Sequence, residues 1–136
     1  MENDKNAIQA LTARFFAVFD NRRGRAPSAE EFTGIFAPGA VIASHREGEP
    51  TLSSPREFVL PRIDLLRSGA LVNFHEWETS AETEVSGTLA VRRTRYEKKG
   101  LLHGAPYGGT GTKHFQFTKL AGAWLILAIS WVDDVN

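Results

Sequence analysis

The chain changes its hydrophobic period near Gly69, and this change limits the folds that it can adopt. Before this glycine, apolar residues recur every three or four positions, as on one face of a helix. After it, they alternate with polar residues over long stretches, as in half-buried strands. Helices followed by a meander of strands predict the α+β class. We expect one domain over residues 1–136, in which a strongly curved antiparallel sheet wraps around N-terminal helices.

Three helices are predicted in the first half of the chain. The first covers 4–23 and carries an apolar stripe made of Ile8, Leu11, Phe15, Val18 and Phe19. A Ser-x-x-Glu capping box at 28–31 begins a short helix that reaches about residue 36. A second box at 54–57, with proline at the first helical position, begins a helix to about residue 67.

Five strands are predicted, at 40–46, 71–84, 88–99, 107–119 or 110–119, and 123–133. If Ser86 and Gly87 form a two-residue turn, Glu78 faces Arg95 across the hairpin. A slip of one residue would exchange the two faces of the sheet, so the predicted pocket depends on this register.

Composition excludes several classes of protein. The 16 basic and 16 acidic residues give a formal net charge of zero, whereas a general nucleic-acid binder needs a basic field. Cysteine is absent, so we expect no disulfides and no thiolate metal site. The histidines lack metal-ligand spacing, and no phosphate loop or dinucleotide fingerprint is present, so no metal or cofactor is predicted. The polar start and the lack of a membrane-length apolar run favour a cytoplasmic protein without a membrane partner.

Five strings of residues, taken in their order and spacing, resemble a known superfamily. They are ARFFAVFD at 13–20, IFAPGAVI at 35–42, SGTLAV at 86–91, GTKHFQF at 111–117 and WLILAISW at 124–131. The chain is similar to the nuclear transport factor 2-like superfamily, in particular its SnoaL-like (polyketide-cyclase-like) and ketosteroid-isomerase-like bacterial members. The resemblance implies a cystatin-like α+β barrel, which is a cone open at one end to a pocket. It also implies that dimers are common.

The resemblance carries a set of ligand-binding positions onto this chain. The predicted ligand-binding residues are Phe15, Phe19, Val91, Arg93, Arg95, Lys113, Phe115, Ile126 and Ser130. Three cations among aromatic rings would suit an anionic or aromatic ligand, because arginine can hold a carboxylate with two hydrogen bonds. Alternatively, these basic residues pair with the acidic residues of the neighbouring strand.

The catalytic groups of the resembling isomerases are not found at the matching positions. Those enzymes use a tyrosine and an acid as oxyanion-hole donors and a carboxylate as the base. Here the matching residues are Phe15, Lys113 and Ser44, none of which can fill its role. The resemblance therefore argues against isomerase activity of that type. Other candidates for a catalytic role are His45, His75 and Asp20.

The last predicted strand is apolar on both faces, which predicts a dimer. One face must pack on the core, and the other needs a second cover. Burying each large side chain is worth about 1.5–3 kcal/mol. We expect a second subunit to cover Leu125, Leu127, Ile129 and Trp131. A loop or helix of the same chain is the alternative.

These observations favour a homodimeric domain that binds a small, partly apolar molecule in a cone-shaped pocket. One alternative is a lyase, isomerase or cyclase that works by general acid–base catalysis, with His45, His75 or Asp20 as the base. Another is a protein-interaction module whose cone is filled by its own side chains.

Overall fold

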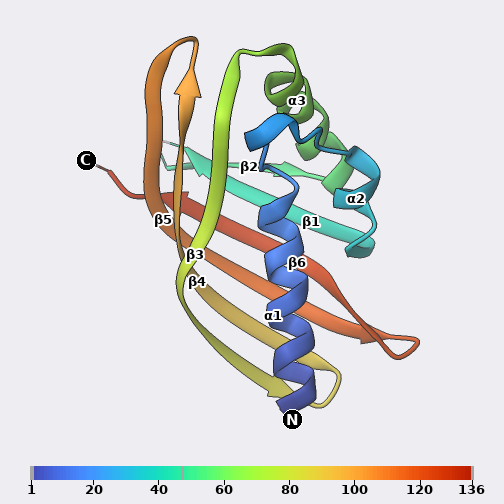
Figure 1. The fold of residues 1–136 in the computed structure, drawn as a ribbon. Helices are drawn as coiled ribbons and strands as arrows, with labels where there is room; N and C mark the ends of the chain where they lie inside the picture. Colours follow the sequence, from blue (N-terminus) through green and yellow to red (C-terminus); the bar gives the residue numbers. More distant parts are fainter. Residues whose placement is uncertain (1, 47, 136) are drawn as a thin grey trace.

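A computed structural model describes residues 2–46 and 48–135, which fold into an α+β structure (Figure 1). Six strands form one sheet in the order β2-β1-β6-β5-β4-β3. Their bounds are Phe36–Arg46 (β1), Glu49–Ser53 (β2), Leu71–Ser86 (β3), Leu89–Leu102 (β4), Ala105–Leu120 (β5) and Ala123–Asp133 (β6). Neighbouring strands are antiparallel except β1 and β6, which are parallel.

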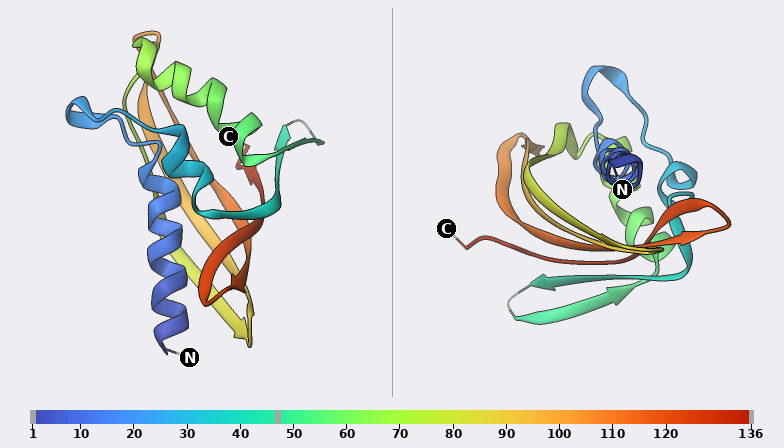
Figure 2. Two further views of the ribbon diagram at one scale, coloured as in Figure 1. Left: turned by 90° about the vertical axis from the view of Figure 1, so that its right-hand side faces the viewer. Right: turned by 90° about the horizontal axis from the view of Figure 1, so that it is seen from below.

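The sheet curls around helix α1 (Glu2–Ala17), and helices α2 (Ala29–Thr33) and α3 (Pro55–Ser68) lie on the same concave side (Figure 2). This arrangement confirms the predicted cone, in which a curved sheet surrounds the N-terminal helices. No helix among the described residues has the length and apolar character needed to span a membrane.

Helix α1 ends six residues earlier than predicted. The prediction continued it to Arg23, but the chain leaves the helix after Ala17. Two backbone N–H groups that a longer helix would pair with its own carbonyls donate to other acceptors instead. The N–H of Asn21 donates to the carbonyl of Phe74 at 3.1 Å, and the N–H of Arg22 donates to Asp20 Oδ1 at 3.0 Å. A short 3-10 turn, η1 (Arg22–Gly24), follows.

The two predicted capping boxes form to different extents. At α3 the box is complete, because Ser54 Oγ accepts from the N–H of Glu57 at 3.1 Å and Glu57 Oε1 accepts from the N–H of Ser54 at 2.8 Å. At α2 only the serine half is present, with Ser28 accepting from the N–H of Glu31. Helix α2 ends at Thr33 rather than near residue 36, because β1 begins there.

The short strand β2 was not predicted. It pairs with the end of β1 as an edge hairpin. Four of its five residues are exposed, and the fifth is half-buried. A strand that buries neither face has no apolar alternation to reveal it in a sequence.

The predicted register of the β3–β4 hairpin is wrong. The turn residues are Gly87 and Thr88, so Ser86 pairs with Leu89. Glu78 consequently lies opposite Tyr96 instead of Arg95. Two register irregularities in β3, at 78–80 and 72–75, each shift the pairing back by one residue. Bulges of this kind insert one unpaired residue and exchange the faces of the strand beyond it.

Strand β6 contains a third irregularity, which explains why both of its faces are apolar. Gln116 pairs with Ala128 and Phe117 pairs with Ile126, so Leu127 is an extra residue. Before this bulge, Trp124 and Ile126 are buried inside, and after it Ile129 is buried inside instead. The inward face therefore changes from even to odd positions within the strand. Placing Leu125, Leu127, Ile129 and Trp131 on one face was wrong.

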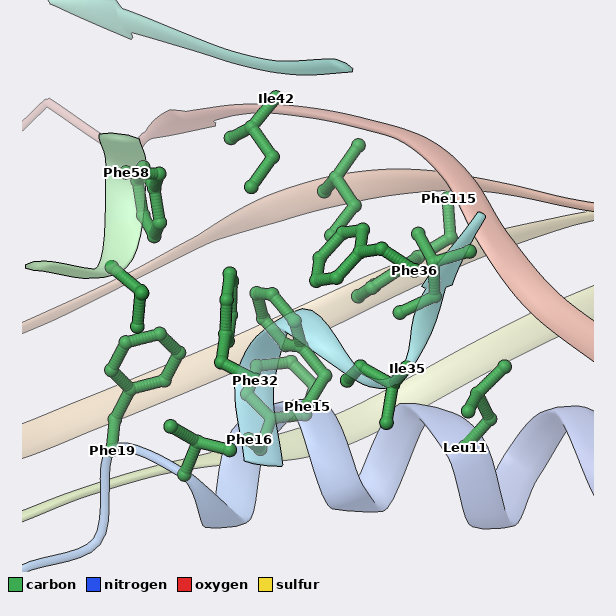
Figure 3. Packing of buried hydrophobic residues seen from close by; sticks show 14 of the residues in the cluster. Leu11, Phe15, Phe16, Phe19, Phe32, Ile35, Phe36, Ile42, Phe58 and Phe115 are labelled. Carbon is green, nitrogen blue, oxygen red and sulfur yellow. The ribbon is translucent and has the colours of Figure 1, made fainter. Parts of the chain in front are cut away.

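A group of phenylalanines fills the interior between α1, α2, α3 and the sheet (Figure 3). Phe15 has the central position, with its ring centroid 5.3 Å from that of Phe115 and 5.6 Å from that of Phe32. Phe32 also packs 4.8 Å from Phe36. These edge-on and tilted contacts close one part of the cone and leave a hollow next to α3.

Candidate functional site: a cavity with buried charges

A cavity of about 520 Å³ lies between α1, α3 and the concave face of the sheet. This volume is typical of pockets for small molecules. The apolar part of its wall consists of Phe15, Phe19, Phe58, Pro61, Leu65, Leu66, Leu71, Phe74, Leu102 and Trp131. The polar part consists of Ser44, His45, Arg62, Glu76, Lys98, Tyr107, Lys113 and Asp133. The cone is therefore not filled by its own side chains.

Local backbone irregularity places Glu76 in this cavity. Asn73 has a positive φ of 50°, within the first irregular segment of β3. Beyond it, Phe74 and Glu76 both line the cavity. Lys113 reaches the same space from β5 by simple alternation, since Lys113 and Phe115 are both buried on the concave face.

Lys113 and Glu76 form a buried ion pair. Lys113 Nζ lies 3.2 Å from Glu76 Oε2, and the two side chains are 4% and 10% exposed. Burial lowers the pKa of Lys113, although the carboxylate of Glu76 acts in the opposite direction. Apart from this ion pair with Lys113, whose angles do not fit a hydrogen bond, the same Oε2 has no hydrogen-bond partner among the described residues. A hydroxyl or amine of a ligand could therefore donate to it.

Aromatic rings enclose the ammonium group of Lys113 on two further sides. Nζ lies 3.9 Å from the ring centroid of Trp131 and 4.1 Å from that of Tyr96. Electron-rich ring faces attract a cation at such distances. Lys113 is thus held by one carboxylate and two rings at the wall of the cavity.

A second polar group surrounds Asp133 at the end of β6. The hydroxyl of Tyr96 donates to Asp133 Oδ1, and Lys98 Nζ lies 3.0 Å from Oδ2. Burial, together with the hydrogen bond to Asp133, raises the pKa of Tyr96, so its hydroxyl remains a donor. Burial alone would raise the pKa of Asp133, but the bond from Tyr96 and the charge of Lys98 outweigh it and keep that pKa low.

The charges of the cavity differ from those predicted. Val91 and Arg93 are exposed on the outer face of the sheet, and Arg95 pairs with Asp134 at 2.7 Å outside the cavity. Their placement in the cone was wrong because Val91 and Arg93 lie opposite the exposed residues Gln116 and His114 of β5. Lys98 takes part instead, together with Arg62, whose guanidinium carbon lies 3.6 Å from the ring centroid of Phe58.

The other predicted ligand-binding residues fall into two groups. Phe15, Phe19 and Lys113 line the cavity. Phe115 and Ile126 are buried in the core, and neither lines the cavity. Ser130 is half-buried and follows the inward-facing Ile129, so it lies on the outer face of β6.

The predicted dimer residues are also divided between the two faces. Trp131 lines the cavity, and Ile129 is 1% exposed in the core. Leu125 and Leu127 remain on the outer side of β6, where Leu127 is 37% exposed.

Of the three candidate catalytic residues, only His45 lines the cavity, and it is exposed. Asp20 is held by Arg22 at 2.9 Å and Arg25 at 3.2 Å, away from the cavity. The hydrogen bond from Arg22 lowers the pKa of Asp20 to about 2. His75 stacks on Trp77 with 4.4 Å between ring centroids, and burial lowers the pKa of its imidazole.

Phe15, Ser44 and Lys113 all line the cavity. They occupy the positions that align with the catalytic groups of the isomerases. Sequence reasoning did not select Glu76 and Asp133, the charged partners of Lys113 and Tyr96, as site residues, although Asp133 at the end of the last strand was within reach of the pocket rim. Glu76 lies in an acidic run, and nothing in the residue pattern separates its inward position from that of its exposed neighbours. No group of residues suited to hold a metal ion occurs in the described part of the chain.

Comparison with solved structures identifies the fold. A nuclear transport factor 2-like superfamily protein from Salmonella enterica superposes with a TM-score of 0.79 at 12% identity, covering 99% of this chain and 94% of that one. A protein of unknown function with a cystatin-like fold, from Nostoc punctiforme, superposes with a TM-score of 0.74 at 15% identity, covering 98% of this chain and 93% of that one. A nuclear transport factor 2-like protein from Novosphingobium aromaticivorans superposes with a TM-score of 0.73 at 17% identity, covering 96% of this chain and 82% of that one.

No protein-family model matches the sequence, and no curated protein matches it. The structural similarity therefore establishes the nuclear transport factor 2-like, cystatin-like fold. The chemistry of the site has to be argued from this chain's own residues.

Proposed function

We propose that the protein binds a small, mainly aromatic molecule in the cavity next to α3, with a hydroxyl or carbonyl group directed at Glu76 and Lys113. One observation carries the proposal: an open cavity with a wall of aromatic and aliphatic side chains also contains the buried Glu76–Lys113 ion pair, in which Glu76 Oε2 has no hydrogen bond among the described residues. Ligand sites commonly combine apolar walls with a few such polar groups.

The charge balance favours an uncharged ligand. Lys113 and Lys98 are already paired with Glu76 and Asp133 of the same chain. A ligand carboxylate that approached either lysine would also approach a carboxylate of the protein. A hydroxyl avoids this repulsion, because it can donate to Glu76 Oε2. A carbonyl oxygen can accept from Lys113 in the same way.

The test compares 2-naphthol with 2-naphthoate by isothermal titration calorimetry. Both are flat two-ring molecules, so the comparison isolates the charge. We expect 2-naphthol to bind more tightly by about tenfold, which corresponds to about 1.4 kcal/mol. Tighter binding of the naphthoate would contradict the charge argument, and the absence of any binding would contradict the proposal.

A matched pair of variants locates the site. Ser44 lines the cavity, whereas Ser80 is exposed on β3. Ser44→Phe should fill part of the cavity and weaken naphthol binding, and Ser80→Phe should leave it unchanged. Equal effects of the two substitutions would place the ligand elsewhere.

An acid–base enzyme is the alternative that the site also supports. Glu76 is a buried carboxylate next to a cation, and Tyr96 is a buried hydroxyl donor close to Lys113. Glu76 thus provides a proton acceptor in the cavity wall, and the Tyr96 hydroxyl, which donates to the cavity residue Asp133, lies nearby as a donor. Conversion of a bound ligand that is lost in Glu76→Gln would favour this alternative over simple binding.

A further inference from the structure

We infer that Lys113 forms a reversible imine with an aldehyde or ketone group of an apolar ligand. This inference rests on the proposed ligand binding and adds a covalent step at the same site. It names the substrate class as carbonyl compounds with a flat apolar body.

The position of Lys113 meets the geometric need of this reaction. Its amine is at the wall of the cavity, and its side chain is 4% exposed. A carbonyl compound would therefore meet this amine only after leaving bulk water. Water removed from the site also disfavours hydrolysis of the imine.

The neighbours of Lys113 suit both the amine and the product. Burial lowers the pKa of Lys113, which raises the fraction of the neutral, nucleophilic amine. Once formed, a protonated imine carries the same single positive charge as the original ammonium. The ring faces of Trp131 and Tyr96 and the carboxylate of Glu76 stabilise either cation.

Glu76 can carry the proton that the reaction moves. The ammonium of Lys113 transfers one proton to Glu76 across 3.2 Å, and the neutral nitrogen attacks the carbonyl carbon. A carbon–nitrogen bond forms, the carbonyl π bond breaks, and one proton passes from the nitrogen to the oxygen, which gives a neutral carbinolamine. Glu76 then returns the proton to the departing hydroxyl. One water leaves, the protonated imine remains, and no oxidant or reductant is consumed.

Other lysines lack this combination of features. Lys98 also lines the cavity, and its Nζ lies 3.0 Å from Asp133. Burial by itself would lower the pKa of Lys98, but the nearby acidic groups outweigh burial and raise this pKa. Lys119 is paired with Asp4 at 3.2 Å. Lys5 and Lys99 are exposed. The structure therefore assigns the reaction to Lys113.

The experiment uses the full chain with 2-naphthaldehyde and sodium cyanoborohydride, which reduces an imine to a stable amine. Intact mass should rise by one naphthylmethyl group, and peptide mapping should place it on Lys113. We expect labelling of Lys113 to be about tenfold faster than that of any other lysine, because the cavity holds the bound aldehyde next to this amine. Labelling that is equal at exposed lysines would overturn the inference.

Variants test the roles of the two partners. Lys113→Arg keeps the charge and should lose the adduct. Glu76→Gln should slow labelling, whereas Glu84→Gln, at an exposed glutamate of the same strand, should not. Equal rates in these two glutamine variants would overturn the role of Glu76. Circular dichroism checks that each variant is folded. Peptide mapping of the unaltered protein tests the inference even if a variant fails to fold.

A parallel titration with 2-naphthylmethanol separates the two proposals. This alcohol has the same rings but cannot form an imine. If the alcohol binds and Lys113 is not labelled by the aldehyde, the imine is excluded and ligand binding stands. If the alcohol does not bind and no adduct forms, both proposals fail.

Discussion

Asn21 and Phe74 exchange two hydrogen bonds that join the chain after α1 to the irregular start of β3. The N–H of Asn21 donates to the carbonyl of Phe74 at 3.1 Å, and Asn21 Oδ1 accepts from the N–H of Phe74 at 2.8 Å. Asn21 Nδ2 also donates to the carbonyls of Leu66 and Leu71. One side chain thus fixes the end of α3, the start of β3 and a wall of the cavity.

Replacing Asn21 with alanine should therefore destabilise the protein. Three hydrogen bonds of the side chain would be lost, and part-buried backbone groups would lose their partners. We expect the free energy of unfolding to fall by about 2 kcal/mol, as measured by urea denaturation. Arg23→Ala, two residues away at an exposed side chain, is the control and should change stability by less than about 0.5 kcal/mol. Equal effects would contradict this account.

Removing only one partner of the Arg92–Glu78 ion pair should lower the free energy of unfolding. Arg92 is 7% exposed and contacts Glu78 with two nitrogens, while Thr83 and Thr94 complete the group. Arg92→Met leaves a carboxylate without its cation and should cost about 3 kcal/mol.

A double substitution tests this explanation. Arg92→Met with Glu78→Leu removes both charges and should be less destabilising than Arg92→Met alone, in urea denaturation of both proteins. Arg93→Met, at the exposed neighbouring position, is the control. If the double variant loses as much stability as Arg92→Met and Glu78→Leu lose in sum when measured singly, the two residues are not coupled.

The acid sensitivity of the protein should depend in part on Asp20. The hydrogen bond from Arg22 lowers the pKa of Asp20 from 3.8 to about 2 in the folded state. Because the folded pKa is the lower one, this stabilisation is present above about pH 4 and is lost as pH falls toward 2. Asp20→Asn should remove about 1 kcal/mol at neutral pH, since water around the half-exposed Arg22 weakens the pair.

Melting temperatures between pH 2 and pH 7 check this prediction. The difference between the unaltered protein and Asp20→Asn should shrink as the pH falls from 4 to 2. Asp64→Asn, at an exposed aspartate of α3, should show no such convergence. A constant difference across the whole range would contradict the prediction.

Gly111 should resist substitution, because Tyr96 fills the space where a side chain would begin. A Cβ at this position would overlap the hydroxyl of Tyr96 and lie 2.5 Å from its Cζ. Gly111→Ala should cost about 2 kcal/mol and displace the ring that flanks Lys113. In the double variant with Tyr96→Phe, removal of the hydroxyl should recover part of the loss. A Gly111→Ala protein with unchanged stability would contradict the packing described here.

The dimer remains a proposal, and the outer face of the sheet is where we expect it. Val41, Ala128, Gln116 and Val91 lie side by side across β1, β6, β5 and β4. Val41 and Val91 are 45% and 47% exposed, and Leu127 adds to this surface. Multi-angle light scattering should report a dimer, and Ala128→Arg should give a monomer that still binds 2-naphthol. A monomeric unaltered protein would exclude the proposal.

The sequence predicts those parts of the fold that depend on local chemistry. The capping box at Ser54 and the stop at Gly69, whose φ is 90°, follow from residue type. The apolar period of α1 and the alternation at Lys113 and Phe115 likewise predict which side chains point inward. Each of these features depends on neighbours within a few positions along the chain.

Features that depend on long-range pairing could not be predicted in this way. The bulges in β3 and β6 are set by the partner strands, and each one exchanges the faces beyond it. For this reason Glu76 was not placed in the cavity. The early end of α1 likewise depends on Phe74, which is 53 residues away from Asn21.

The bulge at Leu127 gives one strand two separate duties. Its first half, with Trp124 and Ile126, belongs to the packed core, and its second half presents Trp131 to the cavity. Within this strand, the tryptophan that packs the core and the tryptophan that meets a ligand are thereby separated. A substitution at Trp131 should therefore alter the ligand preference more than it alters the packing around Trp124 and Ile126.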